Sequence, residues 1–464
     1  MFVVKFMGGV GNQLFQLNFC NYLKSKFPDV ELKCDLSFYK NYKEETLVNG
    51  FHGGFLIQKL PYEIFENSGT RNYIIVKDNK ELTELNPRFN YYFEGYWQNK
   101  DYLFRSYDFN DFFSSSDISE QNLNLKNLIL SKNNSVAVHI RCGDYNNLFG
   151  LGNVATRAYY NNAIRSFKEE APDAYFFVFS NDVNWAKNNL EIHENVYFVD
   201  SNNAQIQALW DMYLMSFCKN FIISNSSFSF WAHVFNKNES KVVFTPEYWT
   251  NEITTFSKTG ESSLQKFYYM KQVSNIPCCS ECSEPVLSLF VNENKDFLGV
   301  RRFIAAALNQ DTTKIKVFVS SRNKKIRQLV QKYSEVNKCV ELIDKEQIPA
   351  AKKAAKFYAE LSVNYYMMQV CARELLLALE KNSNIKELIV PIMTNPQGKT
   401  IMKGAKHYKL PVIYSNMAKS ADSWTLHAPF LCYVDYNKKD FEALVKMQVK
   451  NFIKYILNSV RVMA

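Results

Sequence analysis

The chain has 464 residues, of which 47% are hydrophobic and 15% aromatic, and its formal net charge is +9. This length allows two or three domains of roughly 150 residues each, with ample apolar surface for compact cores. So mild a positive charge over so long a chain argues against a nucleic-acid-binding protein and fits an anionic substrate or an acidic membrane face. The ten cysteines follow no disulfide framework, which favours a reducing compartment.

The N-terminal segment predicts a strand at residues 2–6, a glycine-rich turn and a helix. The helix carries aromatic residues at i, i+4 and i+7, namely Phe15, Phe19 and Tyr22. No targeting segment precedes the strand, and no apolar run reaches the ~20 residues that cross a bilayer. We therefore expect a cytoplasmic protein.

Residues 1–130 are predicted to form one α/β lobe, in which the stretch from about 40 to 120 resists assignment. A polar junction near 131–134 leads to a second lobe, residues 131–270. Strands are predicted there at 135–140, 175–180, 196–199, 221–224 and 242–244, and helices at 159–169, 182–190, 204–218 and 228–235. This alternation predicts a parallel, doubly wound sheet. Asp182 is expected to cap the helix that it begins.

A polar linker at 271–285 precedes a third region, residues 286–464. Strand-like segments at 286–291, 315–320, 340–343, 388–392 and 412–414, with helices between them, predict an additional C-terminal α/β domain of unknown role. The final helix, within 441–460, has an apolar face and a lysine face. It either packs against this domain or rests peripherally on the cytoplasmic membrane.

Four polar segments follow predicted strands, and ligands of open parallel sheets bind at the carboxyl ends of the strands. Gly9 and Gly11 allow main-chain N–H groups to approach a ligand, although a plain tight turn also explains them. Asn12 and Gln13 add neutral hydrogen-bonding groups suited to a sugar or phosphate.

Arg141, just after the first strand of the second lobe, is the strongest single candidate. When a glycosyl nucleotide breaks at its anomeric bond, charge builds on the leaving diphosphate, and a guanidinium matches phosphate oxygens. The alternative is a structural salt bridge between Arg141 and Asp144.

Ser226 and Ser227 precede the helix that starts at Phe228, so their hydroxyls and the first N–H groups of the helix form an anion site. Ordinary helix capping explains the same residues. Asp211, on the preceding helix, either accepts a hydrogen bond from a base or ribose or is merely solvated.

Together these motifs resemble the bacterial α-1,2-fucosyltransferases of glycosyltransferase family 11 over about residues 1–270. The family's Gly-Gly-x-Gly-Asn-Gln-x-Phe-Gln opening is matched at residues 8–16, and its His-x-Arg-Arg-Gly-Asp-Tyr motif at 139–145, except at Cys142. Two further family segments are matched at Ser180, Asp182, Trp185, Asp211, Leu214, Met215, Ser216, residues 225–229 and Trp231.

The resemblance implies an α/β, GT-B-like fold of two Rossmann-type lobes. It also implies inverting transfer of L-fucose from GDP-β-L-fucose to the 2-hydroxyl of a terminal galactose, without a metal ion. The expected partners are GDP-fucose and a galactose-terminated glycan, free or lipid-linked, as in bacterial surface polysaccharide synthesis. No nucleic-acid partner and no cofactor are expected, and the sequence has no Asp-x-Asp motif for a metal–diphosphate.

Carried over residue by residue, the resemblance implies that Arg141 binds the β-phosphate of the donor. It also implies that His139 and Asp211 bind the guanosine. The predicted catalytic residues are Arg141, Asp144 and Asn12. The predicted donor-binding residues, which hold the diphosphate, the guanosine or the fucosyl group, are Gly9, Gly11, Gln13, His139, Arg141, Ser180, Asp182, Asp211, Ser226, Ser227 and Phe228.

Cys142 stands where the family usually has a second arginine, and a thiol cannot replace a bidentate cation. We expect activity to survive, with altered donor binding. Asp144 is a candidate general base, but a dissociative transition state needs little help from a base. The alternatives are a transferase for another GDP-sugar or acceptor, and a glycan- or nucleotide-binding protein without catalysis.

Overall fold

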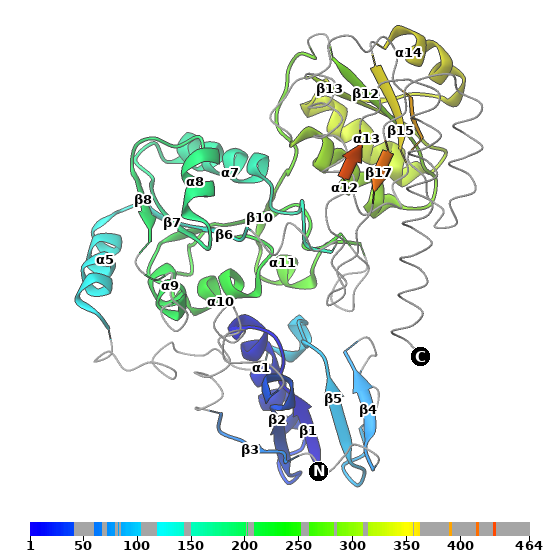
Figure 1. Cartoon of the computed structure of the whole chain (residues 1–464). Helices are drawn as coiled ribbons and strands as arrows, with labels where there is room; N and C mark the ends of the chain where they lie inside the picture. Colours follow the sequence, from blue (N-terminus) through cyan, green and yellow to red (C-terminus); the bar gives the residue numbers. More distant parts are fainter. Residues whose placement is uncertain are drawn as a thin grey trace. The chain divides into compact units, whose positions relative to one another are not determined.

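The computed structural model describes residues 1–40, 60–66, 72–78, 82, 85–103, 118–142, 150–200, 202, 208–251, 259–282, 285–309 and 314–355, and four short strands at 357–361, 389–391, 414–416 and 430–432. The chain divides into two compact units (Figure 1), of which unit 1 ends at Asn275 and unit 2 continues from Ile276. This division falls inside the predicted linker, and each unit has its own hydrophobic core.

The first lobe of unit 1 is built on a sheet of five parallel strands. In spatial order they are β3 (Glu63–Ile64), β2 (Leu32–Asp35), β1 (Phe2–Lys5), β5 (Tyr91–Glu94) and β4 (Ile74–Lys77). The predicted first helix is α1 (Val10–Lys26), and α2 (Ser37–Lys40) and the short 3-10 helix η1 (Lys100–Tyr102) complete the described helices of this lobe. The α/β prediction for the lobe is confirmed, with β3 to β5 coming from the unassigned stretch.

Aromatic packing holds this lobe together. Phe19 of α1 stacks on Trp97 with ring centroids 4.0 Å apart, and Phe93 of β5 meets both rings edge-on. Trp97 has a φ of 57° and is 1% exposed, so a left-handed backbone is held in place by the burial of a large ring. The abundance of aromatic residues here is used for a core.

The second lobe of unit 1 is built on six parallel strands. In spatial order they are β11 (Lys271–Val273), β10 (Val243–Pro246), β9 (Asn220–Ile222), β6 (Ser135–Ile140), β7 (Tyr175–Ser180) and β8 (Val196–Val199). The helices of the lobe are α5 (Glu120–Ser131), α7 (Arg157–Glu170), α8 (Val183–Asn189), α9 (Ala208–Met215), α10 (Ser227–Phe235) and α11 (Ser263–Phe267). In Figure 1, α7 and α8 lie on one side of the sheet and α9 and α10 on the other.

The predicted doubly wound sheet is therefore confirmed. Strands β6, β7 and β8 have the predicted bounds, and Asp182 caps α8 by accepting a hydrogen bond from the main-chain N–H of Trp185 at 2.8 Å. Helix α9 ends at Met215, three residues before the predicted end, while the predicted start at 204 lies outside the described residues. Strand β11 extends the lobe into the segment that we expected to be linker.

Unit 2 holds a third parallel sheet. In spatial order its strands are β14 (Val340–Leu342), β13 (Ile315–Ser320), β12 (Leu287–Asn292), β15 (Phe357–Leu361) and β16 (Ile389–Pro391). Its described helices are α12 (Phe297–Leu308), α13 (Lys324–Val336), α14 (Ile348–Ala354) and the 3-10 helix η5 (Lys345–Gln347). The additional α/β domain is thus confirmed.

Two details of unit 2 correct the sequence reading. Strand β15 was missed, because its short segment does not stand out as an apolar run. The strand predicted at 412–414 is β17 (Tyr414–Asn416), which pairs antiparallel with β18 (Phe430–Cys432) in a separate sheet. The predicted final helix lies outside the described residues. Where the chain is described, no helix has both the length and the apolar character that crossing a membrane requires.

Candidate functional site

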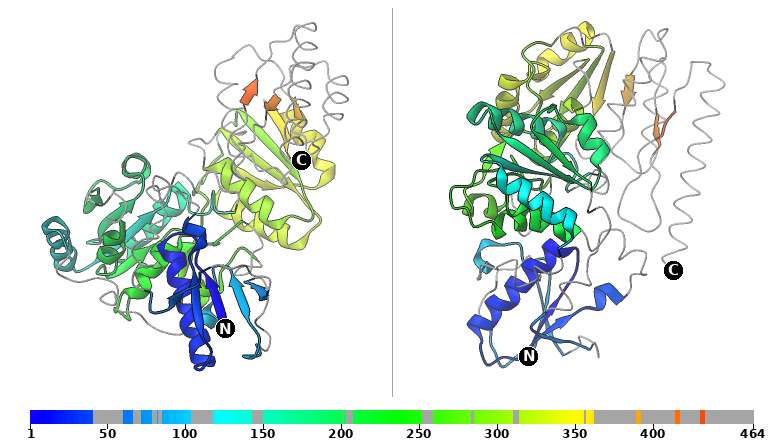
Figure 2. Two further views of the ribbon diagram at one scale, coloured as in Figure 1. Left: turned by 60° about the horizontal axis from the view of Figure 1, so that its bottom comes forward. Right: turned by 90° about the vertical axis from the view of Figure 1, so that its left-hand side faces the viewer.

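Two helices of unit 1 meet at their N-termini through Gly11. A Cβ atom on Gly11 would lie 2.5 Å from the carbonyl carbon of Ser227 and 2.6 Å from the main-chain nitrogen of Phe228. About one turn further along each helix, Phe15 of α1 stacks on Phe230 of α10 with ring centroids 5.0 Å apart. The contacts therefore progress in the same direction along both helices from a shared N-terminal contact, and the blue helix α1 lies next to the green part of the second lobe (Figures 1 and 2).

The electrostatics of this contact favour an anion. A helix N-terminus carries about half a positive elementary charge, and its first N–H groups have no partner within the helix. Neither α1 nor α10 has an acidic residue in its first turn. Gly9, the N-cap of α1, supplies no side-chain cap, whereas the Ser226 hydroxyl accepts from the N–H of Phe228 at 3.3 Å. Two positive helix ends that repel one another are stabilised by a shared anion.

His139, in β6, lies beside the same helix end. Its Nδ1 is 2.8 Å from the hydroxyl of Ser224, which follows β9, and its ring centroid is 5.5 Å from that of Phe228. Burial, and secondarily the charge of Arg141, lowers the pKa of His139 to about 3. The imidazole is therefore neutral at pH 7 and offers hydrogen bonding without charge.

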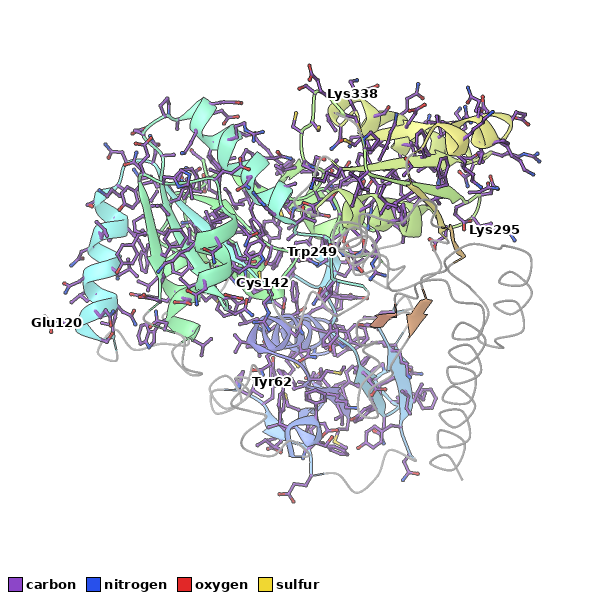
Figure 3. The ribbon with its side chains drawn as sticks, turned by 45° about the horizontal axis from the view of Figure 1, so that its top comes forward. Tyr62, Glu120, Cys142, Trp249, Lys295 and Lys338 are labelled. Carbon is purple, nitrogen blue, oxygen red and sulfur yellow. The ribbon has the colours of Figure 1, made fainter. Side chains whose placement is uncertain are left out.

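Arg141 and Cys142 follow β6 directly, and their environments differ. Arg141 is partly exposed, whereas Cys142 is 4% exposed and belongs to the core of the second lobe (Figure 3). The main-chain N–H of Cys142 donates to Oδ1 of Asn181 at 2.8 Å, and its carbonyl accepts from Nδ2 of Asn181 at 2.9 Å. The side chain of Cys142, at the position where the family usually has a second arginine, is therefore buried in the core.

The first lobe supplies polar side chains with different placements. Gln13 is fully buried, and its Nε2 donates to the Tyr39 hydroxyl at 3.0 Å and to the Gly8 carbonyl at 3.3 Å. Asn12 is partly exposed, and its Oδ1 accepts from Nε2 of Gln98 at 2.8 Å. Gln13 thus fastens the glycine turn from inside the lobe, while Asn12 remains at its surface.

Three other predicted residues take part in local structure. The Ser180 hydroxyl is 3.0 Å from the main-chain nitrogen of Asp182, which caps α8. Oδ1 of Asp211 accepts from Nδ2 of Asn202 at 2.8 Å, and Asn202 also exchanges amide hydrogen bonds with Asn122 of α5. Burial raises the pKa of Asp211 to about 7, although the hydrogen bond from Asn202 acts in the opposite direction.

The structure brings Gly11 to Ser227 and Phe228, and His139 to Phe228. The hydrogen bonds described for Gln13, Asp182 and Asp211 go to other residues, namely Tyr39, Trp185 and Asn202. Asp144 lies outside the described residues. Sequence reasoning missed three polar neighbours of the site, namely Gln98, Asn181 and Ser224. Asn181 and Ser224 belong to the polar segments that follow predicted strands, but they were not among the predicted site residues.

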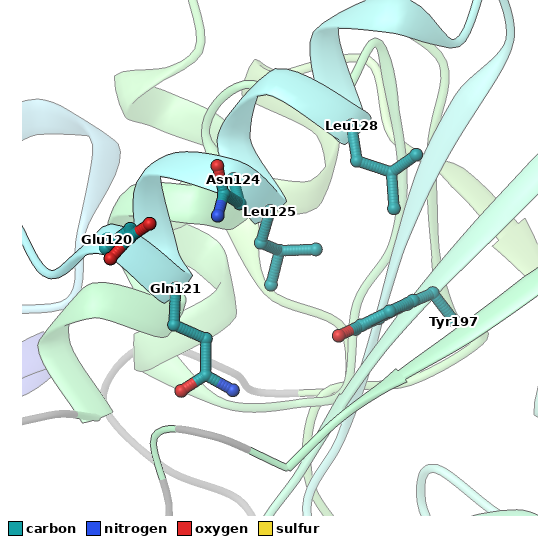
Figure 4. A pocket seen from close by; sticks show the side chains of 6 residues that line it. All are labelled: Glu120, Gln121, Asn124, Leu125, Leu128 and Tyr197. Carbon is teal, nitrogen blue, oxygen red and sulfur yellow. The ribbon is translucent and has the colours of Figure 1, made fainter.

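An open pocket of about 400 Å³ lies elsewhere on the second lobe, between α5 and the edge strand β8 (Figure 4). Its lining residues are Glu120, Gln121, Asn124, Leu125, Leu128 and Tyr197. None of the predicted site residues lines it. Among the described residues, no group of three or more histidine, cysteine, aspartate or glutamate side chains is arranged to hold a metal ion.

Comparison with known proteins agrees with the sequence motifs. The sequence model of the family Glycosyl transferase family 11 matches residues 55–271. The chain is 33% identical over 294 residues to an α-1,2-colitosyltransferase of Escherichia coli, an alignment covering 56% of this chain and 96% of the relative. It is 37% identical over 142 residues to the O-antigen biosynthesis glycosyltransferase WbnK of Escherichia coli, covering 28% of this chain and 47% of the relative.

Solved structures of fucosyltransferases also match half of the chain. The fucosyltransferase NodZ from Bradyrhizobium is 16% identical, covers 50% of this chain and 91% of its own, and gives a TM-score of 0.31. The NodZ α-1,6-fucosyltransferase soaked with GDP-fucose is 12% identical, with coverages of 50% and 92% and a TM-score of 0.28. Because the family model matches residues 55–271 and the colitosyltransferase relative is matched over 96% of its length, this chain belongs to glycosyltransferase family 11.

Proposed function

We propose that unit 1 is a metal-independent α-1,2-fucosyltransferase, which moves L-fucose from GDP-β-L-fucose to the 2-hydroxyl of a terminal galactose with inversion. The observation that carries this proposal is the convergence of the α1 and α10 N-termini beside His139, which lies two residues before Arg141. Such a site suits a diphosphate. Membership of family 11 and an O-antigen relative support a glycan acceptor, and we propose that the enzyme works in the cytoplasm on bacterial surface polysaccharide.

In this proposal the diphosphate lies across the two helix ends and Arg141 pairs with the β-phosphate. As the anomeric C–O bond breaks, its electron pair moves onto the β-phosphate oxygen, and the new bond forms to O2 of galactose. Arg141 and the N–H groups of α1 and α10 meet this growing charge. Losing one such preorganised donor costs about 3–4 kcal/mol of barrier.

The guanosine would be recognised by the side chains of His139, Phe228 and Asp211. The neutral imidazole of His139 suits a hydrogen bond to the nucleoside, and Phe228 beside it offers an aromatic edge. As the family resemblance implies, we also propose that Asp211 binds the guanosine. It would do so through Oδ2, because Oδ1 accepts the hydrogen bond from Asn202.

The proton of the acceptor hydroxyl must leave as the new bond forms. Asp144 is the candidate base, and Asp144→Asn tests it. If Asp144 is the base, kcat should fall about 100-fold or more, because an asparagine side chain cannot take up the proton. The KM for the donor should stay near its original value. An unchanged kcat would indicate that a dissociative transition state needs no side-chain base.

Thermal melting with GDP and donor turnover test the proposal directly. GDP at saturating concentration should raise the melting temperature of the whole chain. Arg141→Ala should keep the fold and lose at least 100-fold in turnover of GDP-fucose. Arg165→Ala is the matched control, because Arg165 lies in the same lobe and forms an exposed ion pair with Glu191 at 3.5 Å, which contributes little to stability. Normal transfer by Arg141→Ala would refute the site.

A different GDP-sugar is the second candidate, because the colitosyltransferase relative is matched over 96% of its length. A donor panel of GDP-linked fucose, colitose and mannose separates the alternatives. A strong preference for colitose or mannose would replace fucose as the transferred sugar. Tight GDP binding without turnover on any galactoside would favour a non-catalytic binding protein, and product linkage is read by NMR.

A further inference from the structure

The end of β6 is held by a side chain from the neighbouring strand. Strands β6 and β7 pair in parallel, and their last partners are Ile140 and Ser180. Asn181 is the next residue of the β7 segment, and its amide group bonds both the N–H and the carbonyl of Cys142, at 2.8 and 2.9 Å. The Asn181 side chain thus continues the hydrogen bonding of the two strands beyond the end of the ladder.

The residue next to Arg141 is fixed from two directions. The thiol of Cys142 is buried in the core of the second lobe, while the main chain of Cys142 is held by Asn181. On the other side of Arg141, Ile140 is fully buried and hydrogen-bonded within the sheet. The backbone on either side of Arg141 is therefore held in place. Because of this, the Arg141 side chain loses less conformational entropy when its guanidinium binds a phosphate.

We propose that Asn181 is a positioning residue, which holds the backbone at Cys142 so that Arg141 meets the diphosphate of a GDP-sugar. This inference rests on the proposed function. It explains why Cys142 is compatible with a working site, because the side chain at that position anchors the strand end in the core. Asn181 itself acts through Arg141.

A double-mutant cycle on GDP affinity tests the inference. Calorimetry with GDP into the millimolar range is run on the whole chain as wild type, Asn181→Ala, Arg141→Ala and the double variant. We expect Asn181→Ala to weaken GDP binding roughly tenfold in the wild-type background and to have almost no further effect when Arg141 is already alanine. Any general loss of stability appears in both backgrounds and cancels in the cycle.

Kinetics add a readout that a merely structural role would not move. In Asn181→Ala the KM for GDP-fucose should rise and kcat should fall, while the KM for the galactoside acceptor stays unchanged. Asn189→Ala is the matched control, because its Nδ2 also bonds a main-chain carbonyl, that of Trp185, at 2.8 Å in the same lobe. This control should bind GDP as the wild type does.

The outcomes separate the two proposals. Absence of GDP binding by the wild type refutes the proposed function. If the wild type binds GDP, then wild-type affinity in Asn181→Ala, or an equal loss in both backgrounds, overturns the role of Asn181. A rise in the acceptor KM that matches the rise in the donor KM also overturns it.

Discussion

Gly11 shows how a single residue can couple two lobes. It lies in the glycine-rich turn that the sequence explains either by a ligand contact or by a plain tight turn. The structure adds a packing reason for the glycine, because the main chain of α10 occupies the space of a Cβ atom. The two roles are compatible, since only so close an approach brings both helix N-termini to one place.

Gly11→Ala should therefore disturb stability and binding together. The new methyl group forces α1 away from α10, which we expect to lower the free energy of unfolding by about 1–3 kcal/mol. The thermal shift with GDP should shrink as the helix ends separate. Urea unfolding and melting with GDP measure these effects, and Gly11→Ser should be worse than alanine. A fully stable alanine variant with an undiminished GDP shift would contradict the prediction.

His233 makes stability depend on pH. It is fully buried in α10 beside Phe230 and Tyr268, and burial lowers its pKa to about 3. Between pH 6.5 and 3 the unfolded chain takes up a proton that the folded chain does not, so stability falls as the pH falls through this range. His139, with a pKa also near 3, contributes in the same direction.

His233→Leu should remove one of these two contributions. At pH 5 the proton uptake of one such histidine costs about 2 kcal/mol, and at pH 8 it costs nothing. We expect the stability of the variant relative to the wild type to be greater at pH 5 than at pH 8 by about this amount. Urea unfolding at both pH values measures it. An identical difference at the two pH values would contradict the prediction.

At the scale of elements, α5 and α9 are joined by a small polar network. Asn122 of α5 and Asp211 of α9 both accept from Nδ2 of Asn202, which lies between them in the chain. The helices contact one another, and Lys126 of α5 also donates to the hydroxyl of Tyr213 at 2.7 Å. Asp211 therefore has a structural partner whatever its role toward the nucleoside.

Asp211→Asn separates those roles. The folded pKa near 7 lies above the ordinary 3.8, so the carboxylate destabilises the fold increasingly from pH 4 to 7. Removing the charge should stabilise unit 1 at pH 8, with an upper limit of about 4 kcal/mol. The gain should fall below this limit, because the residue is partly exposed and solvent screens its charge. Unfolding at pH 4 and pH 8 tests this, and equal effects at both would contradict it.

The same variant reports on guanosine binding. A loss of GDP affinity in Asp211→Asn would support a contact with the nucleoside, whereas undiminished affinity would leave only the network with Asn202. Asn122→Ala is the matched control, because it disturbs the network from α5 without altering the carboxylate.

At the scale of the whole molecule, the family model matches residues 55–271, a range that ends before unit 2 continues at Ile276. One hydrophobic core of unit 1 joins residues of both lobes and another lies within the second lobe, and neither shares a residue with the core of unit 2. The colitosyltransferase relative is matched over 96% of its length by an alignment covering 56% of this chain, which leaves little of the relative to correspond to unit 2.

A chain shortened to residues 1–275 should therefore fold and bind GDP. We expect the same thermal shift with GDP as for the whole chain, and donor turnover of the same order, because the residues of the proposed site all precede Asn275. The thermal shift with GDP and the donor turnover, each measured on the shortened chain and on the whole chain, test this prediction. A shortened chain that folds but lacks turnover would indicate that unit 2 supplies part of the acceptor site.

Local patterns predicted much of the fold. Strands β6, β7 and β8 were placed by apolar runs at their true bounds. For β6 and β7 the reason is that strands buried in a parallel sheet are continuously apolar. Strands β3 and β4 escaped prediction because their side chains are mostly exposed, and β3 has only two residues. Pairing with neighbours, rather than local pattern, creates such strands.

By itself the sequence determined the alternation of strands and helices, the motifs at the strand ends and hence the family. Only the tertiary structure decided which of those residues meet. It placed Gly11 against Ser227 across more than two hundred residues of chain, turned Gln13 and Cys142 inward, and bound the Asn181 side chain to the main chain of Cys142. Spacing along the chain sets where a residue lies on its element, whereas packing between elements sets what its side chain faces.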